Sequence, residues 1–128
     1  MKLDHASAAD LLGAYALAWC TWDGDAFTEL HAPDARSHHD PFEPPVVGRN
    51  AIRANLAEAS NVEEQVELVF ERHWVVVPTI LAAWHASYVD RVSRARVRFA
   101  GFASFEMTDG GLIQSARFWY NRQDSSVQ

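Results

Sequence analysis

Apolar residues in the first part of the chain recur every three or four positions. In the segment that begins at Ser7 they are Leu11, Leu12, Tyr15, Trp19 and Trp22. This spacing predicts an amphipathic helix with an aromatic stripe, and Ser7 and Asp10 have the offset of a capping box at its start. Gly24 is expected to end this helix.

A second helix, a short strand and a third helix are expected next. Asp25 can cap a short helix that Pro33 ends. Residues 35–40 then predict a strand, and the loop after it contains three prolines that restrict its backbone. Gly48 leads into a third helix, in which apolar residues four positions apart lie on one face.

Beyond Asn61 the apolar residues alternate with polar ones, which is the period of a half-buried strand. The expected strands cover residues 66–76, 80–89, 96–107 and 112–121. The run Asp109-Gly110-Gly111 is a hairpin signal between the last two strands, and the polar residues from about 123 predict a frayed tail. Helices followed by an antiparallel meander predict an α+β fold, with helices packed against one face of a curved sheet.

The composition is that of a globular domain, and we expect residues 1–128 to form a single one. Hydrophobic residues make up 48% of the chain and charged residues 22%, which is ordinary for such a domain. The net charge of −6 argues against nucleic acid as a partner, because that binding needs clustered cations. The lone Cys20 excludes an intrachain disulfide. Since no signal peptide or membrane-spanning stretch is evident, we expect a cytoplasmic protein that binds no membrane.

Four short motifs occur in an order that resembles one known group of proteins. They are Gly24-Asp25, Ala32-Pro33-Asp34-Ala35, Asp40-Pro41-Phe42 and Val47-Gly48-Arg49. With the aromatic first helix and the closing hairpin, they resemble the ketosteroid isomerase and SnoaL-like polyketide cyclase branch of the nuclear transport factor two-like superfamily. The resemblance implies a cone-shaped, cystatin-like fold of three N-terminal helices packed against a curved, mostly antiparallel sheet. It also implies a pocket open at one end and a homodimer formed through the sheet.

The same resemblance places a candidate catalytic carboxylate at Asp40. In ketosteroid isomerases the carboxylate that moves the substrate proton corresponds to this position. Those enzymes carry a second acid where this chain has Ala103, and a Tyr near Leu17, half a turn from Tyr15. Polyketide cyclases carry their acid where this chain has Phe118. Because the second acid of the isomerases is absent and Leu17 stands near their Tyr position, steroid isomerisation by that mechanism is not expected; the acid of the polyketide cyclases is absent too.

These comparisons show which side chains of the last two strands are expected to point into the pocket, since both missing acids face the pocket in relatives. Small side chains between aromatic ones then predict an apolar cavity for a flat or cyclic molecule. The alternative is that neighbouring rings collapse into that space. The candidate substrate-binding residues are Trp19, Phe42, Asn55, Phe99, Ala103, Ala116, Phe118 and Tyr120.

Three residues are candidates for catalysis: Asp40, Tyr15 and His85. A poorly hydrated Asp40 would be a general base for a weakly acidic C–H group, or it could simply cap a turn. Tyr15 could donate a hydrogen bond to a substrate oxygen, or pack with its hydroxyl at an edge. His85, in an apolar strand, could transfer a proton or serve as a hydrogen-bonded packing residue.

The run His38-His39-Asp40 raises the question of a metal site. Consecutive side chains on a strand face opposite ways, so only His38 and Asp40 would share a face, and zinc would need a third ligand from elsewhere. We therefore predict no metal, and expect a structural role for His39.

These features predict a cofactor-independent enzyme of the isomerase or lyase type, a dehydratase or cyclase. It would act by general acid–base proton transfer on a hydrophobic cyclic carbonyl or hydroxy compound in an apolar pocket. The alternatives are a non-catalytic protein that binds a hydrophobic metabolite and a dimeric accessory protein.

Overall fold

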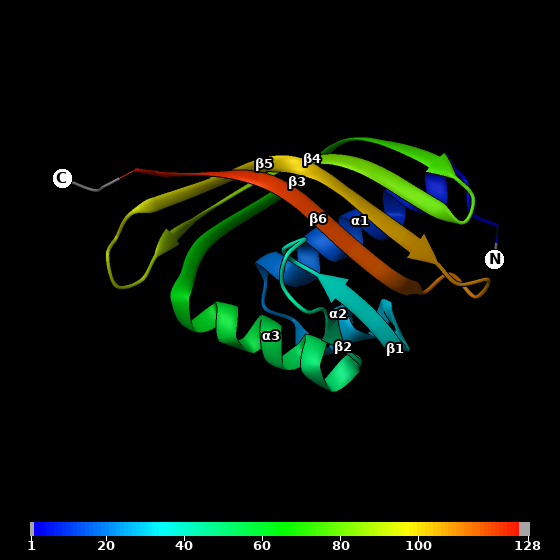
Figure 1. Ribbon diagram of the computed structural model, residues 1–128, viewed down its shortest axis with the longest axis horizontal. Coiled ribbons are helices and arrows are strands. Elements are labelled where there is room, and N and C mark those ends of the chain that lie inside the picture. Colours follow the sequence, from blue (N-terminus) through cyan, green and yellow to red (C-terminus); the bar gives the residue numbers. More distant parts are fainter. Residues whose placement is uncertain (1, 126–128) are drawn as a thin grey trace.

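The computed structural model describes residues 2–125, which form three helices and six strands (Figure 1). The helices are α1 (His5–Cys20), α2 (Gly24–Glu29) and α3 (Arg49–Val62). The strands are β1 (His31–His38), β2 (Val46–Val47), β3 (Glu63–Val76), β4 (Thr79–Asp90), β5 (Arg96–Met107) and β6 (Ile113–Ser125). None of these three helices is long and apolar enough to cross a membrane.

The six strands form one curved sheet in the order β2-β1-β6-β5-β4-β3. β1 runs parallel to β6, and every other neighbouring pair is antiparallel. The helices lie beneath the concave face of the sheet in Figure 1, with α3 below the end of the sheet where β3 begins. This arrangement confirms the predicted α+β fold of helices packed against a curved, mostly antiparallel sheet.

The first two helices begin earlier than their patterns predict. Asp4 caps α1, because its carboxylate accepts the Ser7 N–H at 2.9 Å while the Ser7 hydroxyl accepts the Asp4 N–H at 3.0 Å. The capping box is therefore Asp4 with Ser7, and not Ser7 with Asp10. Asp23 caps α2 by accepting a backbone N–H at 3.1 Å, so Asp25 lies inside that helix.

β1 starts earlier than predicted and ends before Asp40. It contains Pro33, the residue that was expected to end the second helix. Pro33 fits in the strand because the pairing with β6 is interrupted between His31 and Arg36, so no hydrogen bond to β6 needs its missing N–H. The strand stops at His38. Part of the proline-rich segment predicted as loop forms β2, which pairs with β1.

β3 begins directly after α3, three residues before its predicted start at residue 66. Its pairing with β4 is irregular at two places, between Glu64 and Glu67 and between Phe70 and Arg72. At the first irregularity Gln65 has a φ of 52°, in the left-handed region. Such a bulge puts two residues opposite one and reverses the faces of the residues that follow.

β6 runs past residue 121, the predicted end of the last strand. It continues to Ser125 and pairs with the first residues of β5, where the Arg98 guanidinium donates to the Gln123 side chain at 2.6 Å. The tail that was expected to fray from about residue 123 is therefore paired as far as residue 125. Residues 126–128 lie outside the described part of the chain.

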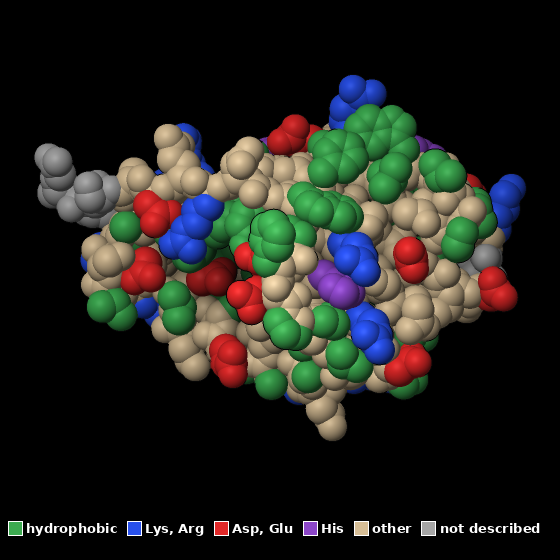
Figure 2. Space-filling model, in the orientation of Figure 1, with side chains coloured by type: hydrophobic (Ala, Val, Ile, Leu, Met, Phe, Trp, Pro, Cys, Tyr) green, Lys and Arg blue, Asp and Glu red, His purple; other side chains and the backbone are tan. Residues whose placement is uncertain are grey.

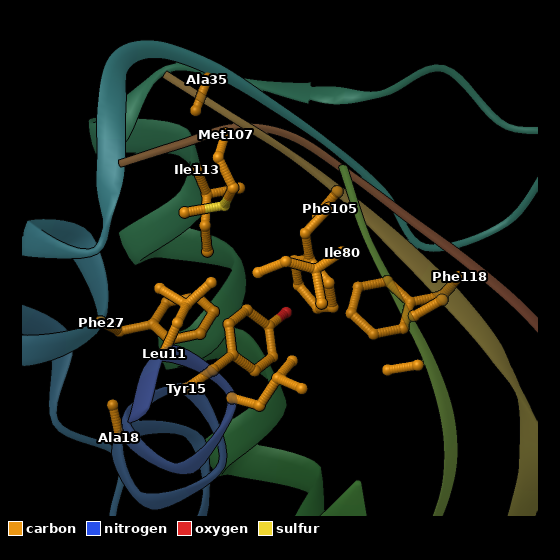
Figure 3. Close-up of a cluster of buried hydrophobic side chains, with 14 of the residues drawn as sticks. Leu11, Tyr15, Ala18, Phe27, Ala35, Ile80, Phe105, Met107, Ile113 and Phe118 are labelled. Atoms are coloured by element: carbon orange, nitrogen blue, oxygen red, sulfur yellow. The ribbon is translucent and has the colours of Figure 1, made fainter. Parts of the chain in front are cut away.

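Tyr15 lies at the centre of the core, between α1 and the sheet (Figure 3). Its ring centroid is 4.9 Å from that of Phe27 and 5.4 Å from that of Phe105, both in edge-to-face contact. Figure 3 shows the hydroxyl group pointing from α1 toward the sheet side chains Phe105 and Phe118. Burying such a ring stabilises the fold by about 2–3 kcal/mol, so this side chain packs the core and also presents a polar group to the sheet.

Candidate functional site

A cavity of about 290 Å³ lies between the helices and the concave face of the sheet. Its apolar wall is formed by Tyr15, Trp19, Ala59, Val66, Leu68, Trp84, Ala86, Tyr88, Phe99, Phe118 and Tyr120. Its polar lining residues are His39, Asn55, Glu63, Glu67 and Ser87. The space-filling view shows a dark hollow left of centre, in which acidic side chains lie among hydrophobic ones (Figure 2). An apolar cavity with a few polar groups is the usual form of a small-molecule site.

The aromatic wall is built by three neighbouring strands. Trp84 on β4 contacts Phe118 and Tyr120 on β6 edge-on, with ring centroids 5.7 and 6.1 Å away. Phe99 on β5 lies 5.2 Å from Tyr120 and stacks against Tyr88 at 5.9 Å. These rings hold one another in place, so they line the cavity and do not collapse into it.

Gly101 on β5 is one of the small residues between aromatic ones in the last two strands, but it does not line the cavity. A Cβ at this position would lie 1.8 Å from the carbonyl oxygen of Trp119 on the neighbouring strand. The glycine is therefore required by the close approach of two backbones, and not by the volume of the cavity. Ala103 and Ala116 are fully buried in the core and do not line the cavity.

The Tyr15 side chain is buried and lines the cavity. Burial raises the pKa of its hydroxyl, so the group stays protonated and can act only as a neutral donor or acceptor. No side chain or backbone group in residues 2–125 forms a hydrogen bond with it. An unpartnered hydroxyl at a cavity wall is suited to bind a polar atom of a ligand.

His39 lies in the cavity, contrary to the structural role expected for it. Its ring is nearly parallel to that of Phe118, with centroids 6.0 Å apart and planes at 11°. Burial lowers the pKa of His39, and the nearby His31 and His38 lower it further, whereas a hydrogen bond with Asn55 raises it. The imidazole is therefore neutral at pH 7. Its Nε2 atom lies 3.2 Å from the Ser37 hydroxyl, so Nδ1 can act as a base when Nε2–H donates to Ser37. Alternation assigned the wrong face because β1 has already ended at residue 38.

Asp40 does not line the cavity. Its carboxylate accepts the backbone N–H of Phe42 at 2.8 Å, which is the turn-capping arrangement considered as the alternative for this residue. Phe42 itself is 94% exposed and also lies outside the cavity. The Asp40-Pro41-Phe42 motif thus shapes the loop after β1, next to the residue that enters the cavity.

His85 points away from the cavity. Its Nδ1 atom lies 2.5 Å from the Glu71 carboxylate of β3, and both side chains are about half exposed. Because residues 84 and 85 face opposite sides of β4, Trp84 occupies the cavity wall and His85 the outer face. The chain therefore brings together Tyr15 with the predicted binding residues Trp19, Asn55, Phe99, Phe118 and Tyr120, but neither Asp40 nor His85.

Glu63 lines the cavity and was not singled out from the sequence. It is the first residue of β3, directly after α3, and burial raises the pKa of its carboxyl group to about 7. The next residue, Glu64, lies outside the cavity and pairs with Arg91 and Arg94. The available signal was the run of acids at a helix-to-strand junction, but the sequence does not show which acid faces inward. No group of three His, Cys, Asp or Glu side chains in residues 2–125 is placed to hold a metal ion.

These features define a class of α+β proteins in which helices and a curved sheet enclose a cavity of small-molecule size. A family model described as a SnoaL-like domain matches residues 12–116, and the chain therefore belongs to the SnoaL-like domain family. Membership confirms the resemblance to the nuclear transport factor two-like superfamily that the sequence motifs indicate. No curated protein matches the sequence closely enough to count as a relative.

Solved structures share this fold at low sequence identity. A hypothetical protein with a ketosteroid isomerase-like fold from Catenulispora acidiphila, in complex with trimethylamine, has a TM-score of 0.80 at 17% identity, over 88% of this chain and 85% of that one. The Δ5-3-ketosteroid isomerase of Mycobacterium sp. has a TM-score of 0.79 at 14% identity, over 93% and 98%. The epoxide hydrolase/cyclase-like enzyme of pyran ring formation in salinomycin has a TM-score of 0.81 at 19% identity, over 92% of this chain and 93% of that one. At these identities the likeness shows the fold alone.

Proposed function

We propose that the protein is a cofactor-independent enzyme of the isomerase or lyase type, acting on a hydrophobic cyclic carbonyl or hydroxy compound in this cavity. The observation that carries the proposal is the pairing of an unpartnered, protonated Tyr15 hydroxyl with a neutral His39 in one apolar cavity. The similar folds of an isomerase and of an epoxide hydrolase/cyclase-like enzyme support it.

The roles follow from the protonation states. Tyr15 donates a hydrogen bond to the substrate oxygen and stabilises the charge that develops there. His39 accepts the proton from carbon, or from a hydroxyl-bearing centre, as a neutral imidazole. The Ser37 hydroxyl, 3.2 Å from Nε2, orients the His39 ring. His39 is the proposed base in place of Asp40 and His85, because those two residues lie outside the cavity.

The test is deuterium incorporation from D₂O into a panel of cyclic ketones and hydroxy-ketones, followed by proton NMR. We expect catalysed exchange in the parent protein and a loss of about 10²-fold in Tyr15→Phe and in His39→Gln. Asp40→Asn should exchange at the parent rate. If Asp40→Asn abolishes exchange and His39→Gln does not, the assignment of the base is refuted.

The alternative is a non-catalytic binding protein for a hydrophobic metabolite. Ala103 and Phe118 favour it, because they stand where relatives carry catalytic acids. Saturable binding of the same ketones, without exchange in any variant, would support this alternative or that of a dimeric accessory protein.

We also propose a homodimer formed through the outer face of the sheet. Trp119 and Phe102 are 44% and 43% exposed there and are opposite each other in register. Trp74 stacks on Phe102 with ring centroids 5.7 Å apart. Hydrophobic side chains also gather along the upper edge of Figure 2, over the sheet. A contiguous apolar patch of this kind is typical of an interaction surface. A cytoplasmic location stays a prediction from the sequence.

A further inference from the structure

The cavity contains carboxylates, but no positively charged side chain is among the described residues that line it. Glu63 and Glu67 lie in its wall, where α3 passes into β3. His39 is neutral because burial lowers its pKa. An apolar site with carboxylates and without Lys or Arg disfavours an anionic ligand and favours a cationic one.

Glu63 and Glu64 are neighbours in sequence with opposite surroundings. The Glu64 carboxylate accepts from Arg91 at 3.1 Å and is also paired with Arg94. The Glu63 carboxylate faces the cavity, and within residues 2–125 it has no hydrogen bond or ion pair with another side chain. Burial alone shifts its pKa, to about 7. A carboxylate without a partner is costly to bury in its charged form, and a cation in the cavity would remove that cost.

The bulge in β3 produces this difference between the two acids. In an unbroken strand, residues 63 and 66 would face opposite sides of the sheet. Here both line the cavity, because Gln65 and Val66 together oppose a single residue of β4. The left-handed φ of 52° at Gln65 is uncommon for a residue with a side chain, and such strain concentrates at functional sites.

Aromatic rings complete the site on the sheet side. Those that line it there are Trp84, Tyr88, Phe99, Phe118 and Tyr120. Ring faces carry negative potential and attract cations. The guanidinium carbon of Arg122 already lies 5.8 Å from the Phe99 ring. Arg122 is itself held by both oxygens of Asp124, at 2.8 and 3.3 Å, so it does not serve as the partner of Glu63.

We propose that the cavity takes a hydrophobic molecule bearing a positively charged nitrogen, with Glu63 as the counter-ion and the aromatic wall around Trp84 and Phe99 enclosing the cation. This inference rests on the proposed function and assigns its substrate to a class, the flat or cyclic compounds with an amine or quaternary ammonium group. Tyr15 and His39 then meet the reacting part of the ligand while Glu63 holds the charged part. Bound cation and ionised carboxylate stabilise each other.

The test uses two probes of the same shape that differ in charge, phenyltrimethylammonium and tert-butylbenzene. Each is titrated into the full chain at pH 8 and followed by tryptophan fluorescence, since Trp19 and Trp84 line the cavity. We expect the cation to bind about tenfold more tightly than the neutral probe. Glu63→Gln should remove this preference and leave the affinity for tert-butylbenzene unchanged. Glu64→Gln, the same change one residue away, should keep the preference.

Equal affinity of the two probes for the parent protein, or an equal loss of both in Glu63→Gln, would overturn the inference. Glu63→Lys provides a second variant, which should bind tert-butylbenzene and reject the cation; retained cation binding would also overturn it. Thermal denaturation shows whether each variant is folded. Binding of tert-butylbenzene without a preference for the cation refutes this inference and leaves the proposed function standing. If neither probe binds in the cavity, this inference is refuted, and the exchange assay with ketones decides the proposed function separately.

Discussion

The imidazole of His39 lies nearly parallel to the ring of Phe118, with centroids 6.0 Å apart and planes at 11°. Phe118 occupies the position on β6 where the resemblance to polyketide cyclases places a catalytic acid. In this chain the position supplies a ring face to a neutral histidine that follows the neighbouring strand β1. The polar group beside Phe118 in the cavity therefore comes from the segment that follows β1 and not from the last strand.

The state of His39 leads to a first prediction. Because burial lowers its pKa below the ordinary value of 6.5, His39 is neutral at pH 7. Burial also lowers the pKa of His31 and of His38, so proton NMR of the imidazole C–H signals should show three histidines that titrate below 6.5. One of these three signals should be absent from the His39→Gln spectrum. A signal assigned to His39 that titrates above 6.5 would contradict the burial of this side chain.

Glu63 makes the stability of the fold depend on pH. Its folded pKa is about 7, above the ordinary value of 4.5, so the folded state binds the proton more tightly than the unfolded chain. The contribution of Glu63 to the free energy of unfolding is fully present below about pH 4.5 and is lost as the pH rises through 7. After allowance for solvent screening at the cavity mouth, the loss is on the order of 1–2 kcal/mol. Glu63→Gln should therefore stabilise the protein at pH 8 but not at pH 4.5.

The measurement is urea denaturation of the parent and of Glu63→Gln at a series of pH values. Other charged groups near the cavity mouth, Glu67, Asp90 and Arg122, are present in both proteins and cancel in the difference. Tyr88 stays protonated over this range, because burial raises its pKa. A difference between the two proteins that does not change between pH 4.5 and 8 would refute the raised proton affinity.

Two glycines give a matched pair of stability predictions. Gly101→Ala should destabilise the protein by at least about 3 kcal/mol, since its Cβ would lie 1.8 Å from the Trp119 carbonyl oxygen. Gly13→Ala, on the exposed side of α1 with nothing within 4 Å, should stabilise it by about 0.5–1 kcal/mol. Thermal denaturation of both variants checks the pair. A parent-like Gly101→Ala would show that β5 and β6 lie farther apart than described.

Asp40 should behave as a turn residue. Asp40→Asn keeps a side-chain oxygen that can accept the Phe42 N–H, so we expect unchanged stability and ligand affinity. Asp40→Ala removes that acceptor and should cost about 1 kcal/mol of stability. Chemical denaturation measures both changes, with probe binding as the second readout. A large loss of binding in Asp40→Asn with the fold intact would show that Asp40 contributes to the binding site.

The outer face of the sheet gives a prediction about assembly. Trp119→Glu places a charge in the centre of the apolar patch and should convert the dimer to a monomer in sedimentation velocity. Val92→Glu is the control, because Val92 is 90% exposed in the turn after β4, outside the patch. A parent protein that sediments as a monomer at all concentrations would refute the dimer.

The sequence predicts the parts of this structure that depend on local periodicity. Helical spacing placed Tyr15 on the buried face of α1. Alternation, with the inward face taken from the resemblance, placed Phe99 and Tyr120 on the cavity side of their strands. Errors arose where the period ends. Once β1 stops at His38, alternation no longer assigns a face to His39 or Asp40, and the structure places His39 in the cavity and Asp40 outside it.

By itself, the amino-acid sequence determined the order of the elements and the α+β class, because these follow from short-range patterns of apolar residues. The inward face of the last two strands was assigned from the resemblance. Only the tertiary structure decided which acid serves the cavity. Glu63 and Glu64 are equivalent in sequence, but the bulge at Gln65 turns one inward, while arginines about thirty residues further along the chain neutralise the other. That choice depends on strand pairing between distant segments, which no local pattern records.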